Sequence, residues 1–452
     1  MAIFLILILS TVLRLVSINQ SLWLDEAIGA LVVKNMSYFD IFTKFSLADN
    51  HPPLYYLTLK LWTNYFGYSE IGLRSLSVLF GLGTIYLVYK LTKSKMATLL
   101  IATAPLHIYY SQEARMYVMA GFLSILAVYL FIKNKFLLLS LTICALIFTD
   151  YVPVFILPVF WIYAILTKKN LAWWKMFLLS HIPLILLGLF WEPVFMFQSE
   201  SGSRLLQTLP AWQNVAGGAT LKQLILFWNK LILGRISFYP KQTYYGLILL
   251  SSIPFILSLK KSFKKENLIY WLWFLVPPAI GFVVSFVFPA FIYFRFLFVV
   301  PAFYILVSKT KSKLLITLML LVNLIGWGIY VTDKTQQREN WKEAVYFVES
   351  NLKTNEAIVL NYPEPFAPYK WYSTKGNKVI SAADSISVNS ELTKTKVSKL
   401  LQNYKGLYYF NYLEDLTDPN QIVRKELSGY GYKKSKTFSF NSVGEVEYLI
   451  KE

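Results

Sequence analysis

Two adjacent acids follow the first apolar segment and are the residues best suited to chemistry. Asp25 and Glu26 stand in the run SLWLDEA, after residues 3–18, and His51 comes a short loop later in HPPLYY. A carboxylate at the rim of a membrane span is costly to desolvate, about 2.5–3.5 kcal/mol if it reaches the helix centre, so it indicates a functional site. Such a carboxylate can take the proton from an attacking hydroxyl group.

Arginines and a further acid recur beside later apolar segments. They are Arg74 in IGLRSLSVLFG, Glu113 and Arg115 in HIYYSQEARMY, and Arg295 in YFRFLF. The planar fork of arginine holds two phosphate oxygens at once, and fixed cations stabilise a phosphate as its charge grows. With the acid pair, these residues predict an enzyme in which a sugar leaves a lipid phosphate.

Other charged residues extend this set. Asp150 ends an apolar run, where it either lines an acceptor cavity or caps the local chain. Residues 192–243 form a long outer segment that supplies the cations Arg204, Lys222, Lys230, Arg235 and Lys241. We expect all of these residues to lie on the outer face of a membrane.

The composition requires a membrane protein. Of 452 residues, 56% are hydrophobic and 15% are charged, and the mean hydropathy is +0.47, values typical of a polytopic chain. The net charge of +19 does not indicate a nucleic-acid partner, because a nucleic-acid reader carries its Lys and Arg on one soluble face. Since the single cysteine, Cys144, lies inside an apolar run, no disulfide within the chain is expected.

The apolar runs predict about eleven membrane spans, some of them shorter than the ~20 residues that a bilayer needs. They are 3–18, 72–90, 97–110, 118–132, 136–150, 152–167, 176–191, 244–259, 268–288, 296–308 and 314–331. The first shows no cleavage site, so we expect a retained span and not a signal peptide. Residues 54–66 are predicted to form a helix lying at the outer surface.

Lysines fix the expected orientation. They fall in five gaps between the apolar runs, at residues 90–95, 133–135, 168–175, 260–265 and 309–313. By the positive-inside rule these gaps should be cytoplasmic. The acids and arginines above, and the tail, then lie outside.

The tail from residue 333 is polar and has no long apolar run. Helical spacing is found at 340–352 and 390–404, and strand-like patterns at 357–360, 378–381, 407–412 and 446–450. We therefore predict a transmembrane catalytic domain over 1–332 and a small soluble α/β domain over 333–452.

The order of SLWLDEA, HPPLYY, IGLRSLSVLFG and HIYYSQEARMY resembles the GT-C glycosyltransferases that use polyprenyl-phosphate sugars. Within them, the chain is most similar to the prokaryotic group related to protein O-mannosyltransferases and the lipid A aminoarabinose transferase. The resemblance covers the first third of the chain in detail and the rest by architecture. It implies a GT-C membrane fold with a small extracytoplasmic domain, and transfer from a polyprenyl-phosphate sugar to a lipid, glycan or protein acceptor.

The resemblance also assigns residues. It places the catalytic base on Asp25 and its partner acid on Glu26, and it gives Arg74 the role of steadying the pair. HPPL matches residues 51–54, while Gln112, Glu113 and Arg115 match the second-loop site, where aspartate is common in place of Glu113. The family's PRYL-like segment corresponds to Arg295. The expected donor-binding residues are His51, Arg74, Glu113, Arg115, Tyr117 and Arg295. Inversion of the sugar linkage is expected.

Structural alternatives remain for these residues. Asp25 suits the positive end of a helix dipole, and Arg74 near a span end can reach the interface alone. Glu113 and Arg115 could pair only with each other, and Tyr117 could be an interfacial anchor. We expect His107 and His181 to be packed or hydrogen-bonded and not to bind a metal.

No cofactor or bound metal is expected; if an ion were needed, Asp25 and Glu113 would be its oxygen ligands. Two other functions compete with the transferase. A transporter or flippase of a lipid-linked or anionic substrate would also carry buried charges, usually at the midplane between related halves. A surface receptor would use the tail to bind a glycan or peptide but would leave the acid pair without a purpose.

Overall fold

The computed structural model describes residues 1–209, 212–361, 366–376, 379–382, 390–400 and 404–452. The chain forms two compact units. A helical unit comprises residues 1–18, 36–203 and 213–336, and a second unit comprises 19–35, 204–212 and 337–452. The sequence prediction divided the chain once, at residue 333; the structure instead groups residues 19–35 and 204–212 with the tail.

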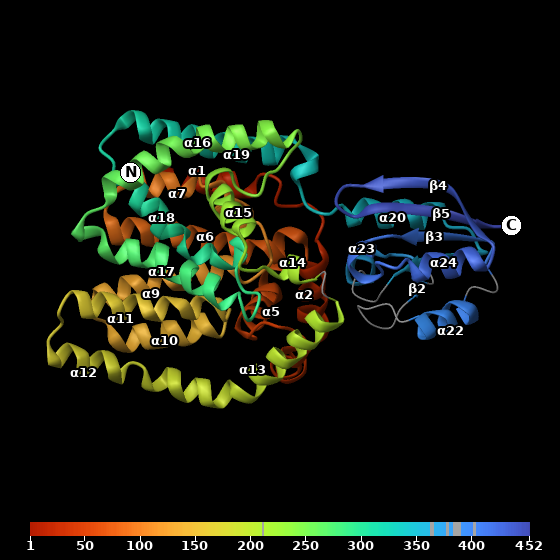
Figure 1. The fold of residues 1–452 in the computed structure, drawn as a ribbon, viewed down its shortest axis with the longest axis horizontal. Coiled ribbons are helices and arrows are strands. Elements are labelled where there is room, and N and C mark those ends of the chain that lie inside the picture. Colours follow the sequence, from red (N-terminus) through yellow and green to blue (C-terminus); the bar gives the residue numbers. More distant parts are fainter. Residues whose placement is uncertain (210–211, 362–365, 377–378, 383–389, 401–403) are drawn as a thin grey trace. The chain divides into compact units, whose positions relative to one another are not determined.

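Long helices build the helical unit (Figure 1). Five are long and apolar enough to cross a membrane, and they are α6 (Glu70–Thr92), α12–α13 (Leu171–Thr208), α16 (Lys241–Ser262), η3–α17 (Lys265–Val284) and α19 (Lys313–Thr332). Shorter apolar helices are α1 (Ala2–Leu15), α9 (Tyr117–Ile132), α10 (Phe136–Ile147), η2–α11 (Val152–Leu166) and η4–α18 (Tyr293–Val307). The predicted membrane class is therefore supported by these helices.

One predicted run, 97–110, is a broken helix. It forms α7 (Lys95–Ala102) and α8 (Pro105–Ser111). Pro105 is the first residue of α8, where its missing amide is harmless, but its ring disfavours helical geometry in the residue before it. The predicted run 176–191 is also interrupted, because α12 ends at Leu179 and α13 begins at Ile182. The remaining predicted runs fall on helices, while the count of eleven crossings stays a prediction.

Short elements complete this unit. Residues 54–66, predicted to be helical, form α5 (Leu54–Phe66), whereas α15 (Leu221–Leu233) was not predicted.

A buried hydrogen-bond network joins three helices. Asn323 on α19 donates to Thr103 Oγ1, at the end of α7, at 3.1 Å and accepts from Tyr304 on α18 at 3.1 Å. Buried amides satisfied in this way rigidify a core.

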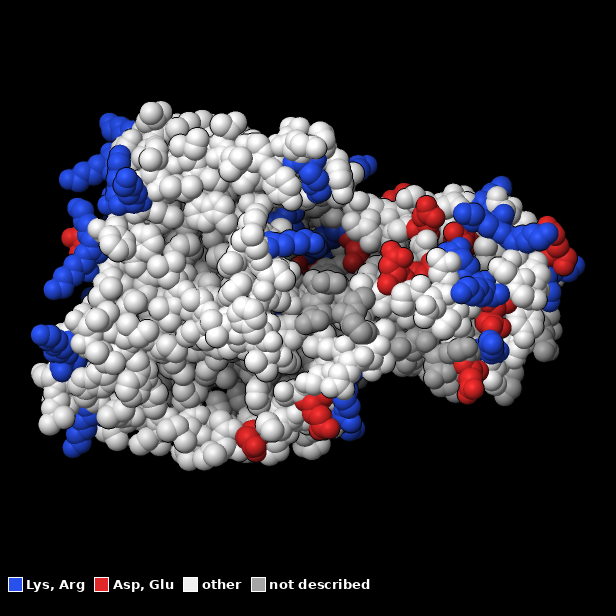
Figure 2. Space-filling model, viewed as in Figure 1, with Lys and Arg blue, Asp and Glu red and all other residues white. Residues whose placement is uncertain are grey.

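A group of Lys and Arg side chains lies at one end of the helical unit. Figure 2 shows Lys and Arg gathered at the left, where Figure 1 places the α11–α12 and α16–α17 connections, while the sides of the unit are largely uncharged on the face shown. These connections contain two of the lysine gaps, 168–175 and 260–265. Both connections lie at the same end, which agrees with the prediction that the lysine gaps lie on one side of the membrane.

The second unit contains a five-stranded mixed sheet. Its strand order is β2-β1-β3-β5-β4, in which β2 (Val379–Ser381), β1 (Glu356–Leu360) and β3 (Gly406–Phe410) are parallel, and β5 (Gly444–Lys451) pairs antiparallel with β3 and with β4 (Tyr432–Phe440). Its described helices are α2 (Leu24–Asn35), α20 (Trp341–Asn351), α21 (Phe366–Tyr372), α22 (Ser390–Leu400), α23 (Glu414–Thr417) and α24 (Ile422–Gly429).

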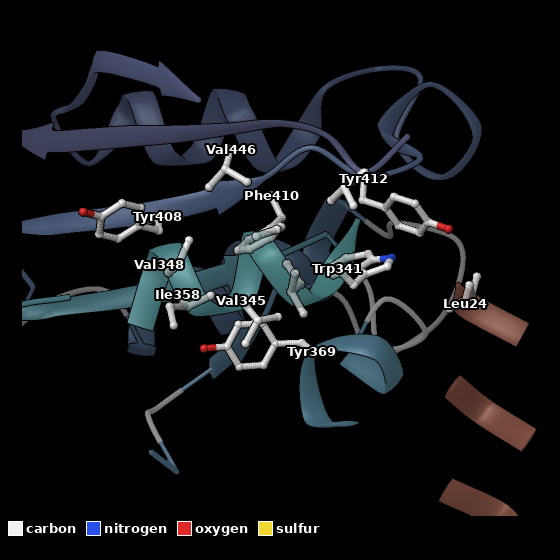
Figure 3. Close-up of a cluster of buried hydrophobic side chains, with 13 residues drawn as sticks. Leu24, Trp341, Val345, Val348, Ile358, Tyr369, Tyr408, Phe410, Tyr412 and Val446 are labelled. Atoms are coloured by element: carbon white, nitrogen blue, oxygen red, sulfur yellow. The ribbon is translucent and has the colours of Figure 1, made fainter. Parts of the chain in front are cut away.

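Both faces of strand β1 are covered. Ile358 and Leu360 of β1 pack in one apolar cluster, whereas Ala357 and Val359 pack in the other. This alternation follows from the two-residue period of a strand. The first cluster also contains Leu24, from the start of α2 (Figure 3).

Candidate active site

Arg115 contacts two tyrosine side chains in the helical unit. It stands in the turn between α8 and α9, is 5% exposed, and donates from Nη1 to the Tyr56 hydroxyl at 2.8 Å. Its guanidinium carbon lies 5.9 Å from the centroid of the Tyr117 ring, within the range of a cation–π contact. Arg115 and Tyr117, both predicted from the sequence, therefore share one site with α5.

His51 joins this site through a carboxylate that the sequence analysis missed. Its Nδ1 lies 3.3 Å from Asp49 Oδ1, and Leu54 N donates to Phe148 O at 3.0 Å, which fastens the HPPL turn to the end of α10. Burial disfavours ionisation of Asp49, but His51 and Arg115 outweigh it, so the pKa of Asp49 is lowered.

Asp150 lies in the loop after α10 and faces the same cations. It is 5% exposed, and its Oδ1 accepts from Val152 N at 3.3 Å. Burial raises the pKa of Asp150, although His51, Arg295 and Arg115 favour its ionised form. Asp150 therefore caps the local chain, which was one of the two interpretations, and it also belongs to the charged site; its lining of an acceptor cavity stays a prediction.

Arg295 approaches from the η4 segment. Its Nη1 donates to Pro289 O at 3.1 Å, and its charge acts on Asp150. Two acids and three basic side chains thus come from four separate parts of the helical unit. We call this set, with the tyrosine that binds Arg115, the loop cluster: Asp49, His51, Tyr56, Arg115, Asp150 and Arg295.

Glu113 has a second set of neighbours. It is 1% exposed and interacts electrostatically with Arg235, whose guanidinium donates to the Tyr109 hydroxyl and lies 5.0 Å from that ring's centroid. Burial opposes the charged form of Arg235, but Tyr109 and other tyrosines, with Glu113, raise its pKa above the ordinary value. The sequence placed Arg235 on the outer face without linking it to Glu113.

Lys230 supports Arg235 from α15. Its Nζ donates to the backbone oxygens of Arg235 and Ile236 at 3.0 and 2.8 Å. Burial, together with Arg235 and Lys241, lowers the pKa of Lys230 to about 7. This lysine can therefore lose its proton near neutral pH.

Arg74 occupies a buried position on α6. Its side chain has no exposed surface, and Nη1 donates to Ile18 O at 2.7 Å, where the first segment ends. A snorkelling side chain would place its guanidinium at the surface. The structure therefore contradicts the simplest structural alternative for Arg74, while its expected action on the acid pair stays a prediction.

Asp25 and Glu26 belong to the second unit. They occupy the first turn of α2, where the helix dipole favours negative charge. Glu26 is 1% exposed. The predicted donor-binding residues are all in the helical unit: His51, Arg74, Glu113, Arg115, Tyr117 and Arg295.

A buried arginine behind α8 was not foreseen. Arg14 on α1 donates to Ser111 Oγ at 3.1 Å and from Nη2 to His107 Nδ1 at 2.8 Å. Because a guanidinium can only donate, His107 accepts through Nδ1.

His181 is also hydrogen-bonded, because its Nε2 accepts from Trp161 Nε1 at 3.2 Å. Both histidines are hydrogen-bonded, as predicted, and the described part of the chain contains no group of three or more His, Cys, Asp or Glu that could hold a metal.

Comparisons with known proteins give a structural relationship only. No known family profile matches the sequence, and no curated protein matches it. The solved structure of ArnT from Cupriavidus metallidurans in the apo state is similar, with a TM-score of 0.55 and 8% identity, covering 99% of this chain and 96% of that chain. The same protein bound to undecaprenyl phosphate gives 0.55 and 9%, covering 99% and 97%.

A second kind of transferase shares the architecture. The oligosaccharyltransferase from Archaeoglobus fulgidus in the apo form has a TM-score of 0.52 and 12% identity, over 100% of this chain and 74% of that chain. ArnT is an aminoarabinose transferase of GT-C type. The GT-C fold predicted from the resemblance is thus confirmed, and the chain is a mostly helical membrane protein of that fold.

Proposed function

We propose that this chain is a membrane glycosyltransferase that moves a sugar from a polyprenyl-phosphate donor to a hydroxyl group. The observation that carries the proposal is the match between 99% of this chain and 97% of ArnT bound to undecaprenyl phosphate. The match includes both the helices and the tail, so it concerns the architecture of a whole enzyme. The acceptor is a lipid, a glycan or a protein.

The loop cluster supplies the chemistry that such a donor requires. A sugar that leaves a lipid phosphate increases the negative charge on the phosphate oxygens, and buried cations stabilise that charge more strongly than exposed ones. His51, Arg115 and Arg295 all act electrostatically on Asp150, so these three basic side chains lie around one part of the helical unit. In this proposal they bind the donor phosphate, while Glu113 and Tyr117 complete the substrate site.

Asp25 is the proposed base. It takes the proton from the acceptor hydroxyl as that oxygen attacks the sugar, and Glu26 is the partner acid. A single direct displacement needs no covalent intermediate, so the linkage at the transferred carbon is inverted. The site faces the extracytoplasmic side, as the lysine gaps predict.

A donor panel tests the proposal. The purified protein is incubated with radiolabelled polyprenyl-phosphate sugars and membrane extract as acceptor source, and the label in free lipid phosphate, free sugar and product is measured. We expect one donor to lose its label to an acceptor in a time-dependent reaction. If every donor remains intact and labelled lipid instead crosses the bilayer of proteoliposomes, the protein is a flippase and the proposal is wrong.

A further inference from the structure

The residue that precedes the helix with the acid pair is a tryptophan, whose side chain cannot cap that helix. The first helical hydrogen bond, from Ala27 N to Trp23 O at 2.9 Å, makes residue 23 the N-cap of α2. Ser, Thr, Asp or Asn usually fills this position because a side-chain oxygen can accept from the free amides of the first turn. The tryptophan indole has only a donor, so an acceptor must come from elsewhere.

Glu339 supplies that acceptor from the start of the tail. Its Oε2 accepts from Leu24 N at 3.3 Å and from Trp341 Nε1 at 2.8 Å, while Oε1 accepts from the Tyr412 hydroxyl at 2.9 Å. Trp341 begins α20 and Tyr412 follows β3. The carboxylate is therefore oriented by two elements of the sheet domain and aimed at the first amide of α2.

Further contacts fix the same short segment. The side chain of Leu24 is 7% exposed and packs beside Trp341 and Tyr412 in an apolar cluster (Figure 3). Three hydrogen bonds tie the residues before it to the tail: Leu22 N to Tyr372 Oη at 2.8 Å, Lys342 N to Ser21 Oγ at 3.1 Å, and Arg338 N to Gln20 Oε1 at 3.0 Å. Asp25 is the next residue along the chain, so its backbone is held from the tail.

We propose that Glu339 is a positioning residue for Asp25, and that the C-terminal domain serves the reaction by holding the first turn of α2. This inference rests on the proposed function, in which Asp25 is the base. Displacement of a reacting group by about 1 Å can cost about 100-fold in rate. A sheet domain that fixes the helical turn carrying Asp25 would prevent such a loss.

The test compares two glutamates of the same unit, Glu339, which is half-buried, and Glu349, which is buried. Glu339→Ala removes the acceptor at α2, whereas the control Glu349→Ala removes a carboxylate whose recorded partners are Tyr369, Ser373 and Thr374. We expect Glu339→Ala to lower kcat about 10- to 100-fold with donor KM within about twofold, and to speed amide hydrogen exchange at residues 24–26. The control should leave both quantities near wild type, even where it lowers thermal stability equally.

A conservative variant separates positioning from charge. In Glu339→Gln the amide oxygen can still accept from Leu24 and Trp341, while its NH2 group donates to the Tyr412 oxygen. Most of the activity and the slow exchange at 24–26 should therefore return. Equal losses in Glu339→Gln and Glu339→Ala, or unchanged exchange in Glu339→Ala, would overturn the inference.

Two arrangements keep the test decisive. If Glu339→Ala does not fold, Tyr372→Phe, which removes the acceptor of Leu22 N, should give a smaller change in the same direction; wild-type exchange in that folded variant would count against the inference. If the wild type transfers no sugar from any donor, the proposed function fails, while the exchange data alone still decide whether Glu339 caps α2.

Discussion

Asp49 and Asp150 lie among the same basic residues, yet their pKa values shift in opposite directions. Burial disfavours both carboxylates. Asp49 has His51 within 3.3 Å and its pKa falls, whereas the more distant charges around Asp150 do not offset burial and its pKa rises. The loop cluster therefore contains one acid that prefers to be ionised and one that resists ionisation.

Asp49→Asn should destabilise the protein at neutral pH. Because the folded pKa of Asp49 lies below its usual value of 3.8, ionised Asp49 adds stability above that value, and this stability is lost as pH falls through the folded pKa. The melting temperature in detergent, measured from pH 7 to pH 3, should therefore show a deficit in the variant that closes in acid. A constant deficit would contradict the assigned shift.

Asp150→Asn should behave in the opposite way. Since the folded pKa of Asp150 lies above 3.8, ionised Asp150 costs stability above the folded pKa, and this cost disappears below 3.8. We expect the variant to melt higher than wild type at pH 7, with the gain shrinking toward pH 4. A variant that melts lower than wild type at pH 7 would show that the cations outweigh burial.

The site residues that the sequence could predict stand in compact motifs. Glu113, Arg115 and Tyr117 stand close together in the sequence; Arg115 lies near the Tyr117 ring, whereas Glu113 interacts with Arg235. Asp49 was not predicted, and Arg235 was predicted only as one of the outer cations, because their roles depend on contacts with His51 and Tyr109. Spacing along the chain carries no signal for a hydrogen bond that joins residues 109 and 235.

At the scale of elements, apolar runs located the membrane helices well but gave little information on amphipathic and edge elements. Residues 221–233 combine apolar residues with the polar pairs Lys222–Gln223 and Asn229–Lys230 and form α15, whereas the sequence prediction treated them as part of a long outer segment. The edge strand β4 carries Lys433, Lys434 and Lys436 and is largely exposed. Lysines on an edge strand discourage pairing with other chains. They also remove the alternation of apolar residues by which a strand is predicted from the sequence.

Close packing of α19 on α15 depends on a glycine. A Cβ atom at Gly326 would lie 2.7 Å from the backbone oxygen of Leu233, whereas at Gly328 it would meet nothing within 4 Å. Gly326→Ala should therefore cost about 1–3 kcal/mol of stability through overpacking, with Gly328→Ala as the control. Thermal unfolding in detergent measures both, and equal melting temperatures would contradict this contact.

The orientation of the helices is tested by labelling. In a Cys144→Ser background, cysteines replace Tyr346 and Lys264, which are both exposed. A membrane-impermeant maleimide applied to intact cells should modify the cysteine at 346 and not the one at 264, because the lysine gap around 264 is expected to be cytoplasmic. The reverse pattern would overturn the predicted topology.

At the scale of the whole molecule, the chain is divided between two units that share its early segment. Residues 19–35 belong with the sheet domain, through contacts such as Leu24 N to Glu339 that join positions 315 residues apart. Periodicity and composition describe local structure, so they could identify the tail as α/β but not its hold on residues 20–24. The fold class was predictable from the sequence, whereas this grouping was not.

The central claim is that this chain transfers a sugar with Asp25 as the base. Its most direct test is the transfer rate of Asp25→Asn, measured with the donor that wild type uses, in a preparation with wild-type elution and melting temperature. The account predicts a rate at least ~100-fold lower, the smallest loss usual for a missing general base. A folded Asp25→Asn protein that turns over near the wild-type rate would contradict it.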